Sequence, residues 1–224
     1  MKRMIGLFGA ILILPMFGLS QTRVETEPVK ELRRSSTLGT CIYQPTAGES
    51  ALYQKLAPNE RSTGSIIEDY DIHKKDGYVS WYGIVRGISK VKNDSWSLLL
   101  EHKFFDGMTD CHIMLVDIAG SGDFRVDIEA ADLTIPALAL VRVYGTIKGQ
   151  EAGTPILAAE YVRVWPWMTF TFSNLMDEDR TNPRWKEVRS IKGRRVYNPW
   201  PDEGYYRAVL GDPKEAGLAL KDKQ

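Results

Sequence analysis

The chain is short of the residues that most catalytic and metal sites need. Its 224 residues include three histidines and two cysteines. Nucleophilic catalysis requires a nucleophile beside an oriented base, yet the sequence has no Gly-x-Ser-x-Gly elbow and no Gly-Lys-Ser/Thr phosphate loop. The sequence therefore lacks a recognisable enzyme motif, and we predict a non-enzymatic protein that uses no cofactor.

The chain also lacks an excess of either charge. It carries 29 Lys and Arg against 29 Asp and Glu. A dedicated nucleic-acid binder usually has a clear basic excess to match the phosphate charge, so the balance disfavours a nucleic-acid partner. A hydrophobic content of 43% is enough for a packed core and argues against wholesale disorder.

The chain has one long uncharged stretch, which lies at its start. Lys2 and Arg3 precede it, and small residues at Gly18 and Ser20 stand before a cut at Gln21. This layout is typical of a secretory signal, and its apolar part is shorter than the ~20 residues of a membrane-spanning helix. We predict a cleavable signal peptide at 1–20. The mature chain would then be periplasmic or secreted, with outer-membrane association as a further alternative and no transmembrane span.

The two cysteines are Cys41 and Cys111. Export to an oxidising compartment makes a disulfide between them possible. On the chain-entropy model it would stabilise the fold by about 4 kcal/mol. The alternative is two separate buried thiols, because a protein of this size can stabilise itself with its own core.

Strand patterns dominate the middle of the chain. Before them, residues 21–63 predict a polar, flexible leader up to Ser36 and a short helix over 49–56. The strand patterns then alternate β-branched and aromatic residues with polar ones. They cover 78–91, 96–105, 111–118 with a continuation at 124–128, 139–148 and 157–164.

These five strand units predict an all-β fold with minor helix. The first unit is long and is interrupted by Gly83 and Gly87, which in barrel strands mark bulges or sharp coiling. We therefore predict a five-stranded, OB-fold-like Greek-key barrel over 64–167. A small sandwich is the competing interpretation.

An aromatic corner ends the barrel region. Pro166 lacks an N–H, so we expect the last strand to end there. We predict that the Pro-rich extension at 168–224 packs on the barrel through Trp167, Phe170 and Phe172. The alternative is an exposed aromatic platform for ligand stacking.

Four segments of the barrel region resemble known proteins. They are VSWYGIVRGI (79–88), LLLEHKFFDG (98–107), LVRVYGTIKG (140–149) and AAEYVRVWPW (158–167). Together they resemble an OB-fold domain of exported bacterial proteins of unassigned function. The last two segments also resemble Slp-type outer-membrane lipoproteins, although this chain has no cysteine just after its signal to carry a lipid. The resemblance implies a fold and leaves function open.

An OB-fold binds ligands across its second and third strands, beside the 1–2 and 4–5 loops. In this chain those loops are 91–95 and 149–155. Basic and aromatic side chains near them form the predicted ligand-binding set: Arg86, Lys90, Trp96, Lys103, Phe105 and Lys148. The alternative is that the aromatics belong to the core and the lysines only solubilise the barrel.

A second candidate cluster lies between the second and third predicted strands. It contains Glu101, His102, Asp106, Asp110 and His112, whose side chains are of types that bind divalent metals. Their spacing fits no standard metal motif, so we predict no metal site.

The leading hypothesis is an exported, non-enzymatic envelope protein whose barrel binds a protein or a cell-surface polymer. The alternatives are a metal-binding protein or enzyme that uses the His102–His112 loop, and a single-stranded nucleic-acid binder.

Overall fold

The structure is a computed structural model of the chain. It describes residues 21–27, 40–58, 60–61, 64–65, 67, 70, 77–105, 108–110, 114–117, 120–166, 169–173 and 203–212. The predicted signal peptide lies outside this range. So do Cys111 and the side chain of Cys41, and with them the predicted disulfide. Among the described residues, no helix has the length and apolar character needed to cross a membrane.

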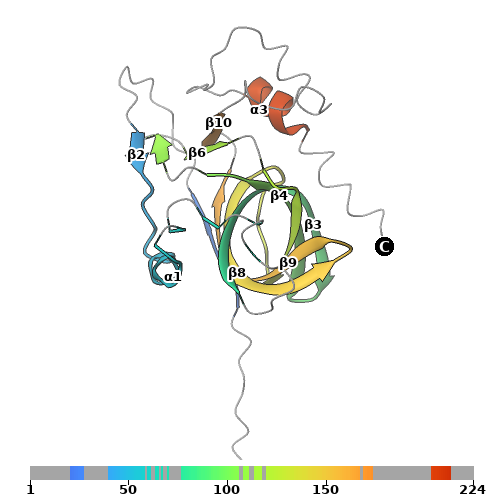
Figure 1. Cartoon of the computed structure of the whole chain (residues 1–224). Helices are drawn as coiled ribbons and strands as arrows, with labels where there is room; N and C mark the ends of the chain where they lie inside the picture. Colours follow the sequence, from blue (N-terminus) through green and yellow to red (C-terminus); the bar gives the residue numbers. More distant parts are fainter. Residues whose placement is uncertain are drawn as a thin grey trace, which may run out of the picture.

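Five strands form a closed barrel (Figure 1). They are β3 (Tyr78–Lys92), β4 (Ser95–Lys103), β7 (Asp123–Glu129), β8 (Leu140–Glu151) and β9 (Thr154–Trp165). The first strand, β3, pairs with both β4 and β8, and β4 pairs with β7. The ring closes where β7 runs parallel to β9, which also pairs with β8. This confirms the predicted all-β, OB-like barrel.

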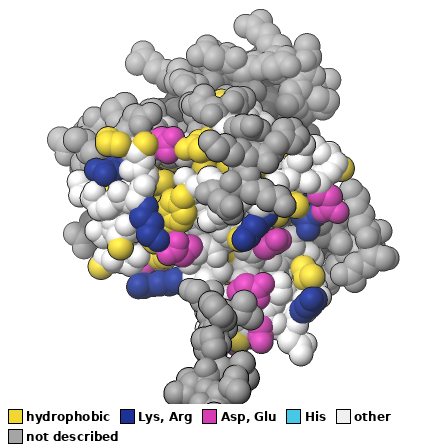
Figure 2. Space-filling model, turned by 60° about the horizontal axis from the view of Figure 1, so that its bottom comes forward, with side chains coloured by type: hydrophobic (Ala, Val, Ile, Leu, Met, Phe, Trp, Pro, Cys, Tyr) yellow, Lys and Arg dark blue, Asp and Glu magenta, His cyan; other side chains and the backbone are white. Residues whose placement is uncertain are grey.

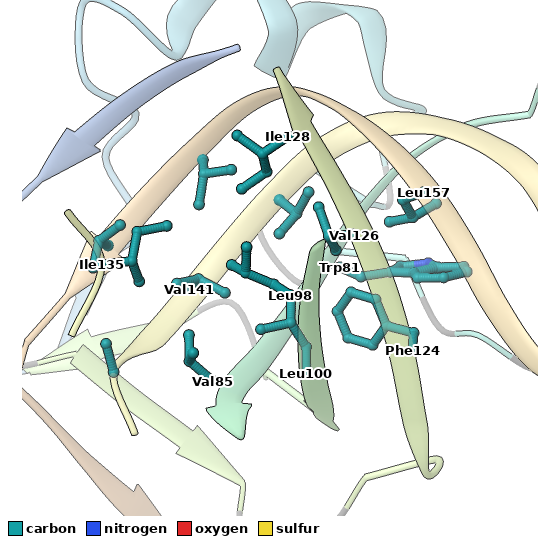
Figure 3. Close-up of a cluster of buried hydrophobic side chains, with 14 of the residues drawn as sticks. Trp81, Val85, Leu98, Leu100, Phe124, Val126, Ile128, Ile135, Val141 and Leu157 are labelled. Carbon is teal, nitrogen blue, oxygen red and sulfur yellow. The ribbon is translucent and has the colours of Figure 1, made fainter. Parts of the chain in front are cut away.

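Alternation along the strands builds the barrel core. Trp81 on β3, Leu98 and Leu100 on β4, and Phe124 and Val126 on β7 have no exposed surface and belong to one cluster (Figure 3). The Trp81 and Phe124 rings meet edge to face at 5.3 Å. Each such aliphatic or aromatic side chain contributes roughly 1.5–3 kcal/mol when buried, so these contacts dominate the stability of the barrel.

Bulges bend the long strands at four register shifts, two between β3 and β4 and two between β8 and β9. One register shift falls between Val85 and Gly87 on β3, at a glycine that the sequence marked as an interruption. Another falls where Tyr144 and Gly145 of β8 pair with Tyr161 and Ala159, which leaves the extra residue, Glu160, on β9. At this shift a Cβ on Gly145 would overlap the carbonyl oxygen of Ala158. A bulge increases the local twist of a strand, which lets it curve around a small barrel.

The third barrel strand differs from the prediction. The 111–118 run was expected to supply it, but its described part, β6 (Met114–Asp117), pairs with β10 (Phe170–Ser173) and β5 (Met108–Asp110). With β2 (Thr40–Ile42) these form a separate four-stranded sheet. The barrel uses β7 instead, because its alternation points Phe124, Val126 and Ile128 into the core.

The predicted flexible leader is partly a strand. β1 (Arg23–Thr26) runs parallel to β9 and pairs with residues 161–164. Just before it, the Thr22 hydroxyl donates to the Ala159 carbonyl at 2.7 Å and accepts from the Glu129 amide at 3.1 Å. Thr22 thus bridges β7 and β9 beyond their short direct pairing, so the prediction of a flexible segment was wrong for residues 23–26.

The start of the C-terminal extension packs on the barrel. β9 ends at Trp165, directly before Pro166, as predicted. Phe170 and Phe172 are fully buried, so they are core side chains, whereas Trp167 lies outside the described residues. Phe170 and Phe172 share a hydrophobic cluster with residues of β3 and of helix α3 (Glu203–Leu210). The buried residues of α3 are Tyr206, Val209 and Leu210. The predicted short helix is also present as α1 (Ser50–Lys55).

Candidate functional site

The turn between β3 and β4 forms an exposed rim at one end of the barrel. A shallow hollow there is lined by Val91, Lys92, Asn93, Asp94, Ser95 and Glu129. Val91 is 57% exposed and is the single large hydrophobic side chain exposed among the described residues. We call these six residues the barrel mouth. It corresponds to the 1–2 loop at which the sequence placed the ligand rim.

Lys90 and Trp96 lie beside the barrel mouth. The Lys90 ammonium sits 5.1 Å from the centre of the Trp96 ring. The indole N–H of Trp96 donates to the Ala130 carbonyl at 2.9 Å, and the ring packs against the barrel core. Trp96 is therefore held in place next to Ser95 of the barrel mouth, with one face under a cation.

Two predicted rim cations are engaged elsewhere. Arg86 and Lys103 both pair with Glu101, at 2.5 and 3.0 Å, and the Lys103 side chain is only 2% exposed. Arg86 also donates to the Leu210 carbonyl at the end of α3. This ion cluster anchors the C-terminal helix to the barrel, so Arg86 and Lys103 do not belong to an open binding rim.

Phe105 and Lys148 complete the predicted set. Phe105 is buried, with its ring 4.8 Å from that of Tyr82 and 5.9 Å from that of Tyr43. It is a core residue, and the prediction of an exposed stacking platform was wrong for it. Lys148 is exposed on β8. Of the six predicted residues, only Lys90 and Trp96 lie together beside the hollow.

The predicted metal candidates are not brought together in the part of the chain that is described. His102 is buried, and its Nδ1 accepts a hydrogen bond from the Ser121 amide at 3.1 Å. Asp106 and His112 lie outside the described residues, as does the side chain of Asp110. No group of three or more His, Cys, Asp or Glu among the described residues is placed to hold a metal ion.

A buried polar cluster that the sequence did not reveal lies on the outer face of the barrel. Arg142 on β8 has no exposed surface. Its Nε donates to the Ser80 hydroxyl and its Nη2 to the Arg61 carbonyl, each at 2.6 Å. Four tyrosine rings surround the guanidinium at 4.7–5.6 Å: Tyr43, Tyr53, Tyr82 and Tyr144. Such cation–π contacts are strongest when they are desolvated, as they are here.

Glu49 supplies the central carboxylate of this cluster and is itself fully buried. It accepts hydrogen bonds from the hydroxyls of Tyr43 and Tyr144. It also accepts from Arg163 Nη1 at 2.8 Å and lies 3.7 Å from Arg142 Nη1. A buried charge requires such compensation, because leaving one unpaired costs several kcal/mol.

Arg163 on β9 is the second cation of the cluster. Its Nη2 pairs with Glu27 at 2.6 Å, and its guanidinium lies 4.7 Å from the Trp165 ring. Two arginines, Arg142 and Arg163, therefore face two glutamates, Glu49 and Glu27. The buried cluster is neutral as a whole, which is what makes its burial tolerable.

The environment shifts the pKa values of these groups. Burial raises the pKa of the Tyr43 and Tyr144 hydroxyls well above their usual value, although the Arg142 charge opposes the shift. Burial alone would lower the pKa of the Arg142 guanidinium, but the tyrosines and Glu49 around it raise it above its ordinary value. At neutral pH the tyrosines are thus neutral hydrogen-bond donors and the arginine is charged.

The cluster joins the barrel to residues 43–58, which we call the strap. The strap contains α1, which lies beside β8 in Figure 1. Its Leu52 and Leu56 pack with Tyr144 and Tyr161 of the barrel. The strap, together with Arg61, Gly64 and Ser65 after it, lies against outward-facing side chains of β3, β8 and β9. We call these side chains the covered face: Ser80, Tyr82, Arg142, Tyr144, Tyr161, Arg163 and Trp165. Arg142 and Tyr144, and likewise Tyr161 and Arg163, alternate with core valines, a pattern visible in the sequence.

The fold and these surfaces together define an all-β, OB-like barrel protein. No protein-family model matches the chain, and a comparison with curated proteins found no match.

Proposed function

We propose that the protein is an exported, non-enzymatic envelope protein whose barrel binds another protein or a cell-surface polymer. The observation that carries the proposal is the barrel mouth. It places an exposed hydrophobic side chain in the 1–2 loop, one of the two loops that border the ligand-binding face of an OB-fold.

The chemistry of the barrel mouth suits a polar partner of mixed charge. Val91 offers an apolar contact, and around it Lys92 is cationic while Asp94 and Glu129 are anionic. The face in Figure 2 likewise shows basic, acidic and hydrophobic side chains interspersed. A phosphate backbone would be repelled by the carboxylates, whereas a protein surface or a polar polymer finds both donors and acceptors.

The barrel-mouth proposal is tested by binding of the mature chain to isolated envelope material. Val91→Asp should reduce sedimentation with envelope fractions, because it places a charge at the apolar contact. The matched control is Ala51→Asp, which introduces the same charge in place of an apolar side chain at an exposed position of α1. Equal binding of both variants would contradict the barrel mouth as the binding surface. Export itself is tested by sequencing the N-terminus of the envelope form, which should begin at Gln21.

A further inference from the structure

The covered face has the composition of a protein-binding hot spot. Apart from Ser80 its members are tyrosine, arginine and tryptophan, the residue types that dominate binding energy at protein interfaces. Aliphatic side chains would be sufficient to pack a short helix against the outer surface of a barrel. Replacing buried ion pairs by such residues is often neutral or stabilising, so the two guanidiniums need another explanation.

The strap holds to this face mainly through polar contacts. Its buried hydrophobic side chains are Tyr43, Leu52 and Leu56, against eighteen buried members in the barrel-core cluster. Glu49 is the centre of the polar attachment, and Thr46 and Lys55 add contacts to Tyr161 and Glu160 of β9. Segments with few buried apolar contacts open at lower free energy than the core around them. The strap is therefore the part of this assembly that can detach while the barrel stays folded.

The strap also leaves the covered face incompletely satisfied. Within the described residues, Arg142 Nη1 and the Tyr82 hydroxyl are buried and have no hydrogen-bond partner. The Nη1 atom lies 3.7 Å from the nearest Glu49 oxygen, beyond hydrogen-bond length. A partner carboxylate that reached Arg142 Nη1 at hydrogen-bond length would pair with it better than Glu49 does.

We propose that the covered face is a docking surface for an acidic protein segment, and that the strap is a built-in competitor for it. The partner segment carries one carboxylate flanked by aromatic and aliphatic side chains, as Glu49 is flanked by Tyr43 and Leu52 in the strap. Charge complementarity selects it, since the face presents two arginines and the strap neutralises them with its own glutamate. This surface is separate from the barrel mouth, so either can fail without the other.

The first test uses a synthetic peptide of residues 43–58 as the probe and Glu49→Ala as the released form. The labelled peptide should bind the Glu49→Ala protein at least about tenfold more tightly than the wild type, because the attached strap competes at high effective concentration until its anchor is removed. A peptide with glutamine in place of the glutamate should bind at least about tenfold more weakly. Adding Arg142→Met should abolish binding, whereas Arg125→Met, at a half-buried arginine of β7 that is not part of the covered face, should not. No binding, or equal binding of both peptides, would overturn the proposal.

A second measurement on the wild-type protein keeps the proposal testable if Glu49→Ala does not fold. The Tyr53 amide donates to the Glu49 carbonyl within the strap, and the Val85 amide donates to Ala139 in the barrel. In hydrogen exchange the Tyr53 amide should exchange at least about tenfold faster than the Val85 amide, by opening of the strap alone. If both amides exchange at the rate of global unfolding, the strap does not open and the proposal is wrong.

Discussion

Removing the charge of Glu49 is the sharpest perturbation of this structure. Glu49→Gln keeps the shape of the side chain but leaves Arg142 and Arg163 with one carboxylate, Glu27, between them. The glutamine amide also has an NH₂ group in place of one carboxylate oxygen. That NH₂ cannot accept the hydrogen bond that Arg163 or the tyrosines donate to Glu49. Breaking a buried ion pair by removing one partner costs about 3–5 kcal/mol. In a chain of about 200 residues, each kcal/mol lowers Tm by about 2–4 °C, so we expect a loss of roughly 6–20 °C.

Thermal unfolding followed by near-UV circular dichroism measures this effect. The loss should show either as a lower Tm or as an earlier transition of the tyrosine signal when the strap detaches first. Glu160→Gln is the matched control, because Glu160 ties Lys55 of the strap to β9 through an exposed ion pair. Exposed pairs contribute about 0–1 kcal/mol, so the control should melt close to the wild type. If Glu49→Gln melts within about 2 °C of the wild type, with no earlier transition, the reasoning about the buried cluster is refuted.

Three further predictions concern the barrel itself. Thr22→Val leaves the Ala159 carbonyl and the Glu129 amide unpaired and should cost about 1–3 kcal/mol in denaturant unfolding, whereas Thr22→Ser keeps the hydroxyl and should not. Gly145→Ala should cost about 1–3 kcal/mol of unfolding free energy, because the new Cβ would overlap the Ala158 carbonyl. Gly77→Ala, whose Cβ would have its nearest neighbour at 3.4 Å, should change the stability by less than about 0.5 kcal/mol. Equal effects of the two substitutions would refute this prediction. Burial raises the pKa of the Asp127 carboxyl, so its ionisation opposes folding at neutral pH and the penalty disappears as pH falls through that raised pKa. Asp127→Asn should therefore be more stable than the wild type at pH 7 and equal to it in acid, and a stability gain that persisted in acid would contradict this.

The barrel could be predicted from the sequence because its information is local. Alternation along β3, β4, β8 and β9 marks the strands, and Gly87 marks a bulge that the structure confirms. The third strand was misplaced because the 111–118 run is as apolar as β7, and only pairing with β10 takes its described part out of the barrel. β1 was missed because four residues that add to an existing strand need no pattern of their own.

The buried cluster could not be predicted, for a physical reason. Arginine and glutamate on a strand or a short helix are normally solvated, and burial becomes tolerable only when the partners converge. Glu49 meets Arg142 and Arg163 across 93 and 114 residues of chain, and sequence spacing does not reveal such a contact. For the same reason Arg86 and Lys103 looked like rim cations, although both face Glu101 beneath α3.

Site-specific photo-crosslinking in living cells tests most directly whether the barrel mouth is a binding surface. A photoreactive residue at position 91 should give an adduct with an envelope protein or polymer. The same residue at the exposed position 207 on α3 should give none. Adducts from position 207 and none from position 91 would contradict the account.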